Sequence, residues 1–167
     1  MILAIDPGTK CAGWSFWRNL QASGWRVFSC GLLRWGSTAE LFETAKHKRL
    51  DLFGTRFAPL AVGVRVVCEL PQVYSQRHWK GDPNDLIGVA VSAGLVIGAL
   101  DFDDVEFVKP HAWKGNTPKP IHNKRVLAAL GDGRKIYDDA CKTIPASLHH
   151  NVVDAIGLGA WAAKKDR

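Results

Sequence analysis

Three acidic residues lie at the edges of otherwise apolar segments. Asp6 ends the run "MILAID", Glu69 ends "VRVVCE", and Asp154 lies inside "HHNVVDAIGLGAWA". A carboxylate among apolar neighbours is costly unless it is paired, hydrogen-bonded or bound to a metal ion. Since carboxylate oxygens suit hard cations such as Mg²⁺, one explanation covers all three acids. We predict that they share a divalent cation.

Each acid also has an ordinary explanation. Asp6 precedes Pro-Gly, a position where Asp often caps a turn. Glu69 fits a solvated strand end, and an acid near a helix start, as in the segment of Asp154, interacts favourably with the helix dipole. Asp154 lies too far inside its segment for the dipole to explain it well, and taken together the three acids favour the metal site.

The elements that must position these acids follow from apolar periodicity and from turn residues. Three strands come first, and later strands alternate with helices, which predicts an α/β fold with a mixed sheet flanked by helices. The expected strands are 1–6, 13–17, 25–35, 62–70 and 104–108, and the expected helices are 38–53, 85–100, 121–130, 134–143 and 148–164.

Length and composition bound the class of protein. The 167 residues, 47% apolar and 23% charged, suit one domain spanning 1–167. The formal charge of +6 favours polyanionic partners. The four cysteines form no CxxC pair, and the N-terminus has no signal-peptide pattern, so we expect reduced thiols and a cytoplasmic location.

One long uncharged stretch, "LIGVAVSAGLVIGAL", is shorter than the roughly 20 residues that span a bilayer. We therefore expect a buried helix and no membrane partner. Ala90, Gly94 and Gly98 recur every four residues and form a small-residue stripe on one face. The stripe fits either packing on the domain's own sheet or a helix contact across a two-fold dimer.

At these residues the sequence resembles a known family. The segments "AIDPGTKCAGW", "VVCELP" and "HHNVVDAIGLGAWA", in this order, look like those of the RuvC-like Holliday junction resolvases of the RNase H superfamily, especially the phage-type members. The resemblance implies an RNase H-like, five-stranded mixed sheet with strands 1–3 antiparallel. It also implies a homodimer that hydrolyses phosphodiesters at four-way DNA junctions or related branched DNA.

Carried over to this chain, the resemblance makes Asp6, Glu69 and Asp154 catalytic metal ligands. The cofactor would be Mg²⁺, for which Mn²⁺ can substitute, and two cations would activate water and stabilise the leaving oxygen. The sequence departs from the family at the fourth ligand, because Asn151 stands three residues before the final acid.

Helical spacing leaves two candidates for the fourth ligand. Asn151 and His150, three and four residues before the last acid, both lie near its face, and His149 is turned further away. We favour His150 as a catalytic metal ligand, because imidazole binds metals and accepts protons near neutral pH.

The connector "KPHAWKGNTPKPIHNKRVLAAL" carries the basic residues. Lys114 and Lys124 fall where the family keeps catalytic lysines near the scissile phosphate, and Lys119 and Arg125 are candidates for contacts with DNA phosphates, with surface solvation the alternative. Trp113 is expected in the core.

The loop "YSQRHWKG" follows the second acid and mixes basic and aromatic side chains. Such a mixture suits phosphate contact with stacking on unpaired bases, so we predict that Arg77, His78, Trp79 and Lys80 bind DNA. An ordinary loop with one packed tryptophan is the alternative.

Two other functions remain open at this point. One is a nuclease of the same superfamily that acts on RNA-containing duplexes. The other is a catalytically silent nucleic-acid-binding scaffold, against which the three intact acids argue.

Overall fold

The computed structural model describes residues 1–167 except 22–23, 48–62, 73–81, 83, 101 and 167. Five strands form one sheet in the order β3-β2-β1-β4-β5. They are β1 (Ile2–Pro7), β2 (Cys11–Asn19), β3 (Trp25–Arg34), β4 (Arg65–Glu69) and β5 (Val105–Val108). The first three strands are antiparallel, and β4 lies parallel to both β1 and β5. The predicted mixed sheet is confirmed.

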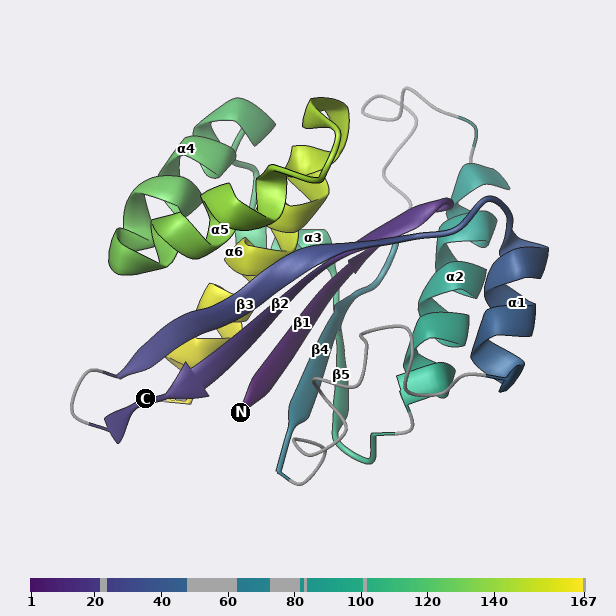
Figure 1. The fold of residues 1–167 in the computed structure, drawn as a ribbon, viewed down its shortest axis with the longest axis horizontal. Coiled ribbons are helices and arrows are strands. Elements are labelled where there is room, and N and C mark those ends of the chain that lie inside the picture. The colour runs from purple at the N-terminus through teal and green to yellow at the C-terminus, as the bar shows by residue number, and fades with distance from the viewer. Residues whose placement is uncertain (22–23, 48–62, 73–81, 83, 101, 167) are drawn as a thin grey trace.

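Helices cover both faces of the sheet, as Figure 1 shows. The helices are α1 (Thr38–His47), α2 (Asn84–Leu100), α3 (Pro110–Lys114), α4 (Lys119–Ala129), α5 (Arg134–Cys141) and α6 (His149–Lys165). α1 and α2 lie on one face, and α4, α5 and α6 lie on the other.

The predicted helices are present, with differences at their ends. The expected continuation of α1 to residue 53 lies outside the described residues. α4 begins two residues earlier than expected, because Pro120 occupies its first turn, where a missing N–H costs nothing. The short helix α3 was not predicted, and Pro110 likewise stands at its start.

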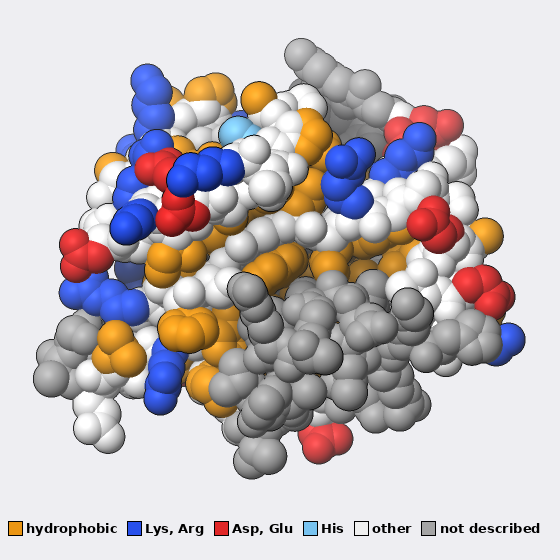
Figure 2. All heavy atoms as spheres, in the orientation of Figure 1, with side chains coloured by type: hydrophobic (Ala, Val, Ile, Leu, Met, Phe, Trp, Pro, Cys, Tyr) orange, Lys and Arg blue, Asp and Glu red, His pale blue; other side chains and the backbone are white. Residues whose placement is uncertain are grey.

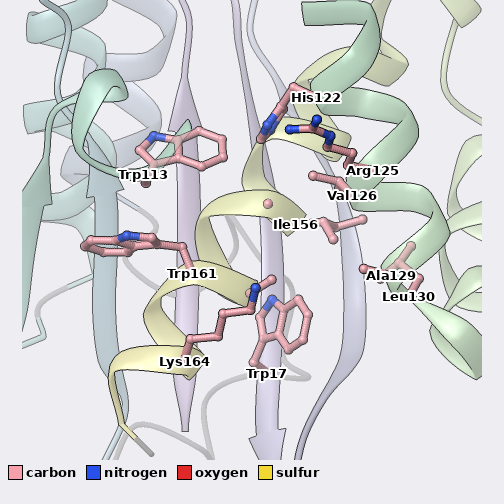
Figure 3. A pocket seen from close by; sticks show the side chains of 12 residues that line it. Trp17, Trp113, His122, Arg125, Val126, Ala129, Leu130, Ile156, Trp161 and Lys164 are labelled. Carbon is pink, nitrogen blue, oxygen red and sulfur yellow. The ribbon is translucent and has the colours of Figure 1, made fainter. Parts of the chain in front are cut away.

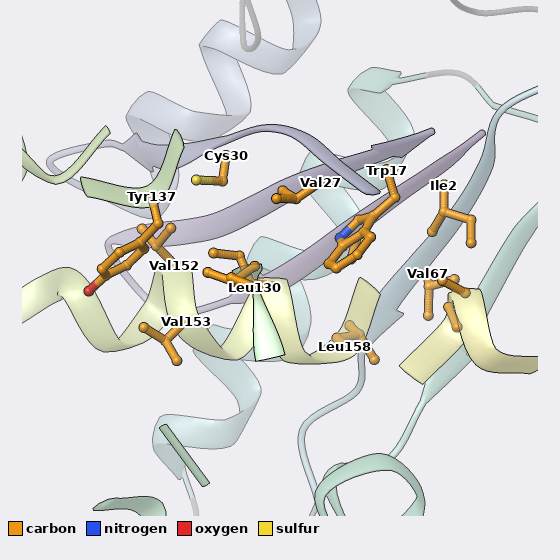
Figure 4. Close-up of a cluster of buried hydrophobic side chains, with 14 of the residues drawn as sticks. Ile2, Trp17, Val27, Cys30, Val67, Leu130, Tyr137, Val152, Val153 and Leu158 are labelled. Carbon is orange, nitrogen blue, oxygen red and sulfur yellow. The ribbon is translucent and has the colours of Figure 1, made fainter. Parts of the chain in front are cut away.

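Alternating side chains divide the core into two halves. Ile2 and Ala4 of β1 pack with the residues of α6, whereas Leu3 and Ile5 pack with α1 and α2. Figure 4 shows the half beneath α6, with Ile2 among its buried side chains. This period of two is what an extended strand buried on both faces requires.

Glycines bring α6 unusually close to β2. A Cβ atom on Gly13 would lie 2.0 Å from the backbone oxygen of Asn151, and one on Gly159 would lie 2.1 Å from Nε1 of Trp17. The hydroxyl of Ser15 donates a 2.8 Å hydrogen bond to the carbonyl of Ala155. The helix is therefore held directly on the strand that pairs with β1.

The small-residue stripe of α2 does not pack on the sheet. Ala90, Gly94 and Gly98 are exposed, and a Cβ atom on either glycine would meet nothing within 4 Å. The other side of the helix, with Ala93 and Val96, is buried. The interpretation as internal packing is wrong, because this helix is apolar on all sides and its other face meets the sheet.

No helix in the described part of the chain is long and apolar enough to cross a membrane.

Candidate active site

Strand register places the first two acids side by side. β1 and β4 run parallel, and Ile5 stands opposite Cys68, so Asp6 and Glu69 are the next residues along each strand. Asp6 shares the parity of Ile2 and Ala4, and its side chain therefore points to the face covered by α6. The carboxyl ends of two neighbouring parallel strands thus bring two carboxylates to one edge of the sheet.

The third acid comes from α6. Asp6 pairs across the sheet with Gly13, and the missing side chain of Gly13 admits the backbone of Asn151. Asp154 follows one turn later on the same helix and is buried, with 4% of its surface exposed. One glycine therefore sets the distance between the helix acid and the strand acids.

The three carboxylates interact electrostatically. Burial raises the pKa of Asp6 well above its usual value of 3.8, and the charges of Glu69 and Asp154 raise it further. Burial also raises the pKa of Glu69, against the lowering effect of Lys114 and Trp113. Acids that repel one another in a buried site call for positive charge.

Two lysines of the connector supply positive charge. The Nζ atom of Lys114 lies 3.1 Å from Oε2 of Glu69, and that of Lys119 lies 3.5 Å from Oδ2 of Asp154. Burial lowers the pKa of Lys114, but the charges of Glu69, Asp154 and Asp6 outweigh it and raise the pKa above 10.5. The ammonium of Lys114 therefore lies in the field of all three acids.

Trp113 has a contact that the sequence did not reveal. Its indole Nε1 donates a 2.7 Å hydrogen bond to Oε2 of Glu69. The ring also packs at the edge of the core, as predicted, and lies edge-on to His122 at 5.1 Å between ring centroids. The only signal in the sequence was the position of Trp113 beside Lys114 in the connector.

His122 of α4 is the second residue that sequence reasoning missed. Its Nε2 atom lies 3.9 Å from Oδ1 of Asp154. Both atoms are buried without a hydrogen-bond partner in the described part of the chain. Burial lowers the pKa of His122, so this ring is neutral at pH 7.

Each of the three candidates for the fourth ligand has a polar contact of its own. The Nε2 atom of His149 lies 2.8 Å from the carbonyl of Ile144, and its ring lies edge-on to Tyr137. The amide of Asn151 donates to Sγ of Cys11 at 3.4 Å. 

His150 is half-buried and senses the charges of the site. Burial lowers its pKa, and so does the charge of Lys119, whereas Asp154 raises it. A hydrogen bond with the backbone of Ser147 also raises its pKa, and His150 stays our predicted ligand because its ring lies in the electric field of Asp154 and Lys119.

A cavity of about 710 Å³ opens beside Asp154, and five of its lining side chains can carry or donate a proton. They are His111, Lys114, Lys119, His122 and Asp154. In this cavity, which we call the active-site cavity, Lys114 and Lys119 supply two positive charges against the one acid, Asp154. The cavity is a suitable environment for a phosphate group.

The remaining predicted DNA contacts are more distant from the acids or outside the described residues. Lys124, which the resemblance made a catalytic lysine, and Arg125, predicted to contact DNA phosphates, are exposed on α4, and neither forms an ion pair with an acid in the described part of the chain. The predicted contacts in the loop after Glu69 lie outside the described residues, namely Arg77, His78, Trp79 and Lys80.

Positive and negative side chains are mixed on the surface formed by α4 and α5, where Figure 2 shows lysine and arginine beside acids. On α5 these charges pair locally, Arg134 with Asp138 at 2.9 Å. A face of alternating charges is typical of solvated helices, so these local pairs do not by themselves indicate a DNA-binding surface.

The donor chemistry of the site fits a divalent cation. Asp6 is a buried carboxylate destabilised by two others, and Oδ1 of Asp154 is buried without a partner in the described part of the chain. As the side chains stand, no group of three His, Cys, Asp or Glu residues among those described is arranged to hold a metal ion. Lysines instead engage Glu69 and Asp154 and compensate their charge.

The architecture and the acid-bearing strand ends define an RNase H-like fold, and solved structures share it. RuvC of Thermus thermophilus superimposes with a TM-score of 0.60 at 17% identity, over 99% of this chain and 96% of RuvC. The fowlpox virus resolvase in complex with Holliday junction DNA gives 0.59 at 17% identity, over 98% and 97% of the two chains. T. thermophilus RuvC in complex with a Holliday junction substrate gives 0.55 at 18% identity, over 99% and 94%.

The particular architecture is therefore that of the RuvC-type resolvases, as the sequence motifs predicted. No family model and no curated protein sequence matches the chain.

Proposed function

We propose that this chain is a divalent-metal-dependent endonuclease that cleaves four-way or related branched DNA. The observation that carries the proposal is the convergence of Asp6, Glu69 and Asp154 on one face of the sheet beside a basic cavity. The shared fold supports the choice of substrate, since two of the similar structures are complexes with Holliday junction DNA.

In this proposal the three acids and His150 hold Mg²⁺, or Mn²⁺ in its place. When bound, the cation acidifies a water molecule and stabilises charge on the phosphodiester. The chain's own contribution is to fix the carboxylates on strand ends and one helix, which are rigid elements. The burial of Asp6 and Asp154 strengthens the charge interactions in the site.

The lysines bind the phosphate in this scheme. Lys114 contacts Glu69 and Lys119 contacts Asp154, so a phosphate beside the carboxylates lies within reach of both ammonium groups. Lys119, which the sequence indicated only as a phosphate contact, lies closer to the acids than its position in the connector implied. Lys124, for which the resemblance implied a catalytic role, is exposed on α4 like Arg125, and in this proposal both bind the DNA backbone further out.

The imidazole of His150 has one basic nitrogen for two uses in this proposal. Because burial and the charge of Lys119 lower its pKa below 6.5, the ring is neutral at pH 7, and that nitrogen either binds the cation or accepts a proton from the attacking water. We expect His150→Ala to reduce cleavage far more than His149→Ala or Asn151→Ala. The wild-type rate should rise with pH through a midpoint below 6.5, and equal losses at His150 and Asn151 would contradict this role.

Substrate choice with added metal tests the proposed function. The purified chain is incubated with a synthetic four-way junction, an RNA–DNA hybrid and a linear duplex, each with Mg²⁺, with Mn²⁺ and with chelator. We expect metal-dependent cleavage of the junction and retained junction binding without metal, since phosphate contacts supply the affinity. Cleavage of the hybrid alone would identify an RNA-directed nuclease, and metal-independent binding without any cleavage would identify a scaffold.

The proposed enzyme acts as a two-fold dimer. Paired cuts on opposite strands need two sites at a fixed separation, and α2 offers an exposed apolar face for a second copy. This face carries the exposed stripe, and Ile87 and Val91 beside it are 63% and 44% exposed. Small residues let two helices approach closely, and the flanking side chains then bury apolar area.

A further inference from the structure

A second cavity, of about 220 Å³, lies between α4 and α6. Its walls include Trp17, Trp113 and Trp161, which are three of the seven tryptophans in the chain. Figure 3 shows Trp113 and Trp161 on one side and the side chains of α4 on the other. We call this cavity the tryptophan pocket.

The titratable side chains of the tryptophan pocket are basic, and none is acidic. Arg125 and Lys164 line it, together with His122, and no Asp or Glu does. A further cation lies nearby, since the Nζ atom of Lys165 is 4.2 Å from the ring centroid of Trp161. A ligand of this pocket should therefore combine a flat aromatic group with negative charge.

The tryptophan pocket adjoins the proposed active site. His122 lines both cavities, and Trp113, in the pocket wall, donates its indole N–H to Glu69. A ligand in the pocket would thus lie one side chain away from two of the three acids.

We propose that the tryptophan pocket binds an unpaired nucleotide of the branched DNA, with the base against the indole rings and the phosphate against Arg125 and Lys164. This inference rests on the proposed function and extends it. A base within a duplex has both faces covered by its neighbours, so only a base that leaves the stack can enter. Stacking on aromatic side chains and phosphate contact with Arg or Lys are the two interactions that hold unpaired nucleotides on proteins.

Binding there would anchor the strand next to the site of cleavage. Bases near a branch point are the ones most readily unpaired, and a captured base fixes the position of the phosphates that follow it. The pocket would then favour junctions that carry an unpaired nucleotide at the crossover, and position the strand relative to the three acids.

Photocrosslinking locates the captured base. A four-way junction with one unpaired 5-iododeoxyuridine at the crossover is bound in chelator, which prevents cleavage, then irradiated and mapped by mass spectrometry. We expect adducts on Trp113 or Trp161. If the junction binds and is cleaved in Mg²⁺ but adducts form only elsewhere, the pocket assignment is wrong and the proposed function stands. If no junction is bound, both are wrong.

A matched pair of variants tests the pocket by filling it. Ala129 lines the pocket and Ala128, its neighbour on α4, does not, and both are exposed. Affinity is measured for junctions with and without the unpaired nucleotide. We expect the extra nucleotide to strengthen binding about tenfold for wild type and Ala128→Phe, and Ala129→Phe to lose this gain while binding the plain junction normally. An equal gain in all three proteins would overturn the inference.

Discussion

Removing the indole N–H of Trp113 tests how the candidate site is positioned. Trp113→Phe keeps an aromatic ring beside His122 but deletes the 2.7 Å hydrogen bond to Glu69. This hydrogen bond lowers the pKa of Glu69, which burial otherwise raises above 4.5. We therefore expect Glu69 in the variant to be protonated over a wider range of pH, and to bind Mg²⁺ less well.

The expected magnitude follows from the burial of the pair. A hydrogen bond to a charged group contributes about 1.5–3 kcal/mol, and the side chain of Glu69 is only 13% exposed, so solvent screens little of it. Lys114 keeps its contact with the same carboxylate at 3.1 Å and compensates part of the loss. We expect the lower end of this range, which corresponds to about tenfold weaker activity at subsaturating Mg²⁺.

The assay is junction cleavage across a matrix of pH and Mg²⁺ concentration. The deficit of Trp113→Phe should be largest at low pH and low Mg²⁺, and should shrink as either is raised. Trp25→Phe is the matched control, because Trp25 packs on the same core and its Nε1 atom has no hydrogen-bond partner in the described part of the chain. Superimposable profiles for Trp113→Phe and wild type would refute the positioning role.

Three further predictions concern charge and assembly. The pKa of Asp6 is higher in the folded protein than in the unfolded chain, so wild-type stability falls as pH rises through that folded value. Asp6→Asn should therefore abolish cleavage, keep junction binding, and raise the metal-free Tm at pH 7 by about 2–4 °C, the shift that about 1 kcal/mol produces. A lower Tm would contradict this. Lys114 has a raised pKa and stabilises the fold at all pH values below about 10.5, so Lys114→Met should lower the metal-free stability by about 1–3 kcal/mol and millimolar Mg²⁺ should restore part of it in thermal melts. Gly94 faces open space, so the Gly94→Leu variant should remain folded by circular dichroism but sediment as a monomer. The control variant Ala128→Leu should sediment as a dimer. A wild-type chain that is monomeric at micromolar concentration would contradict the proposed dimer.

Much of the fold could be predicted because its signals are local. A few residues are enough to mark each strand and its end. The apolar run before Asp6 ends at the Pro-Gly turn, and a later apolar run ends at Glu69. The outward face of α2 could not be predicted, since Ser92 and Ala93 are buried and Val91 is exposed. A helix that is apolar on every side has no periodicity to tell which side meets the sheet.

The acids of the candidate site could be found for a related reason. A carboxylate is conspicuous in an apolar segment, so the sequence alone marks Asp6 and Asp154, and both are buried in the structure. The groups that position them are not conspicuous, because a tryptophan or histidine fits a core as well as a site. The hydrogen bond from Trp113 to Glu69 joins residues 44 positions apart, and it exists because β5 lies beside β4 and leads directly into α3. Strand order, which sets this contact, is a property of the whole sheet. Residues that position the acids, such as Trp113, can therefore be identified only when the acids have been placed in three dimensions.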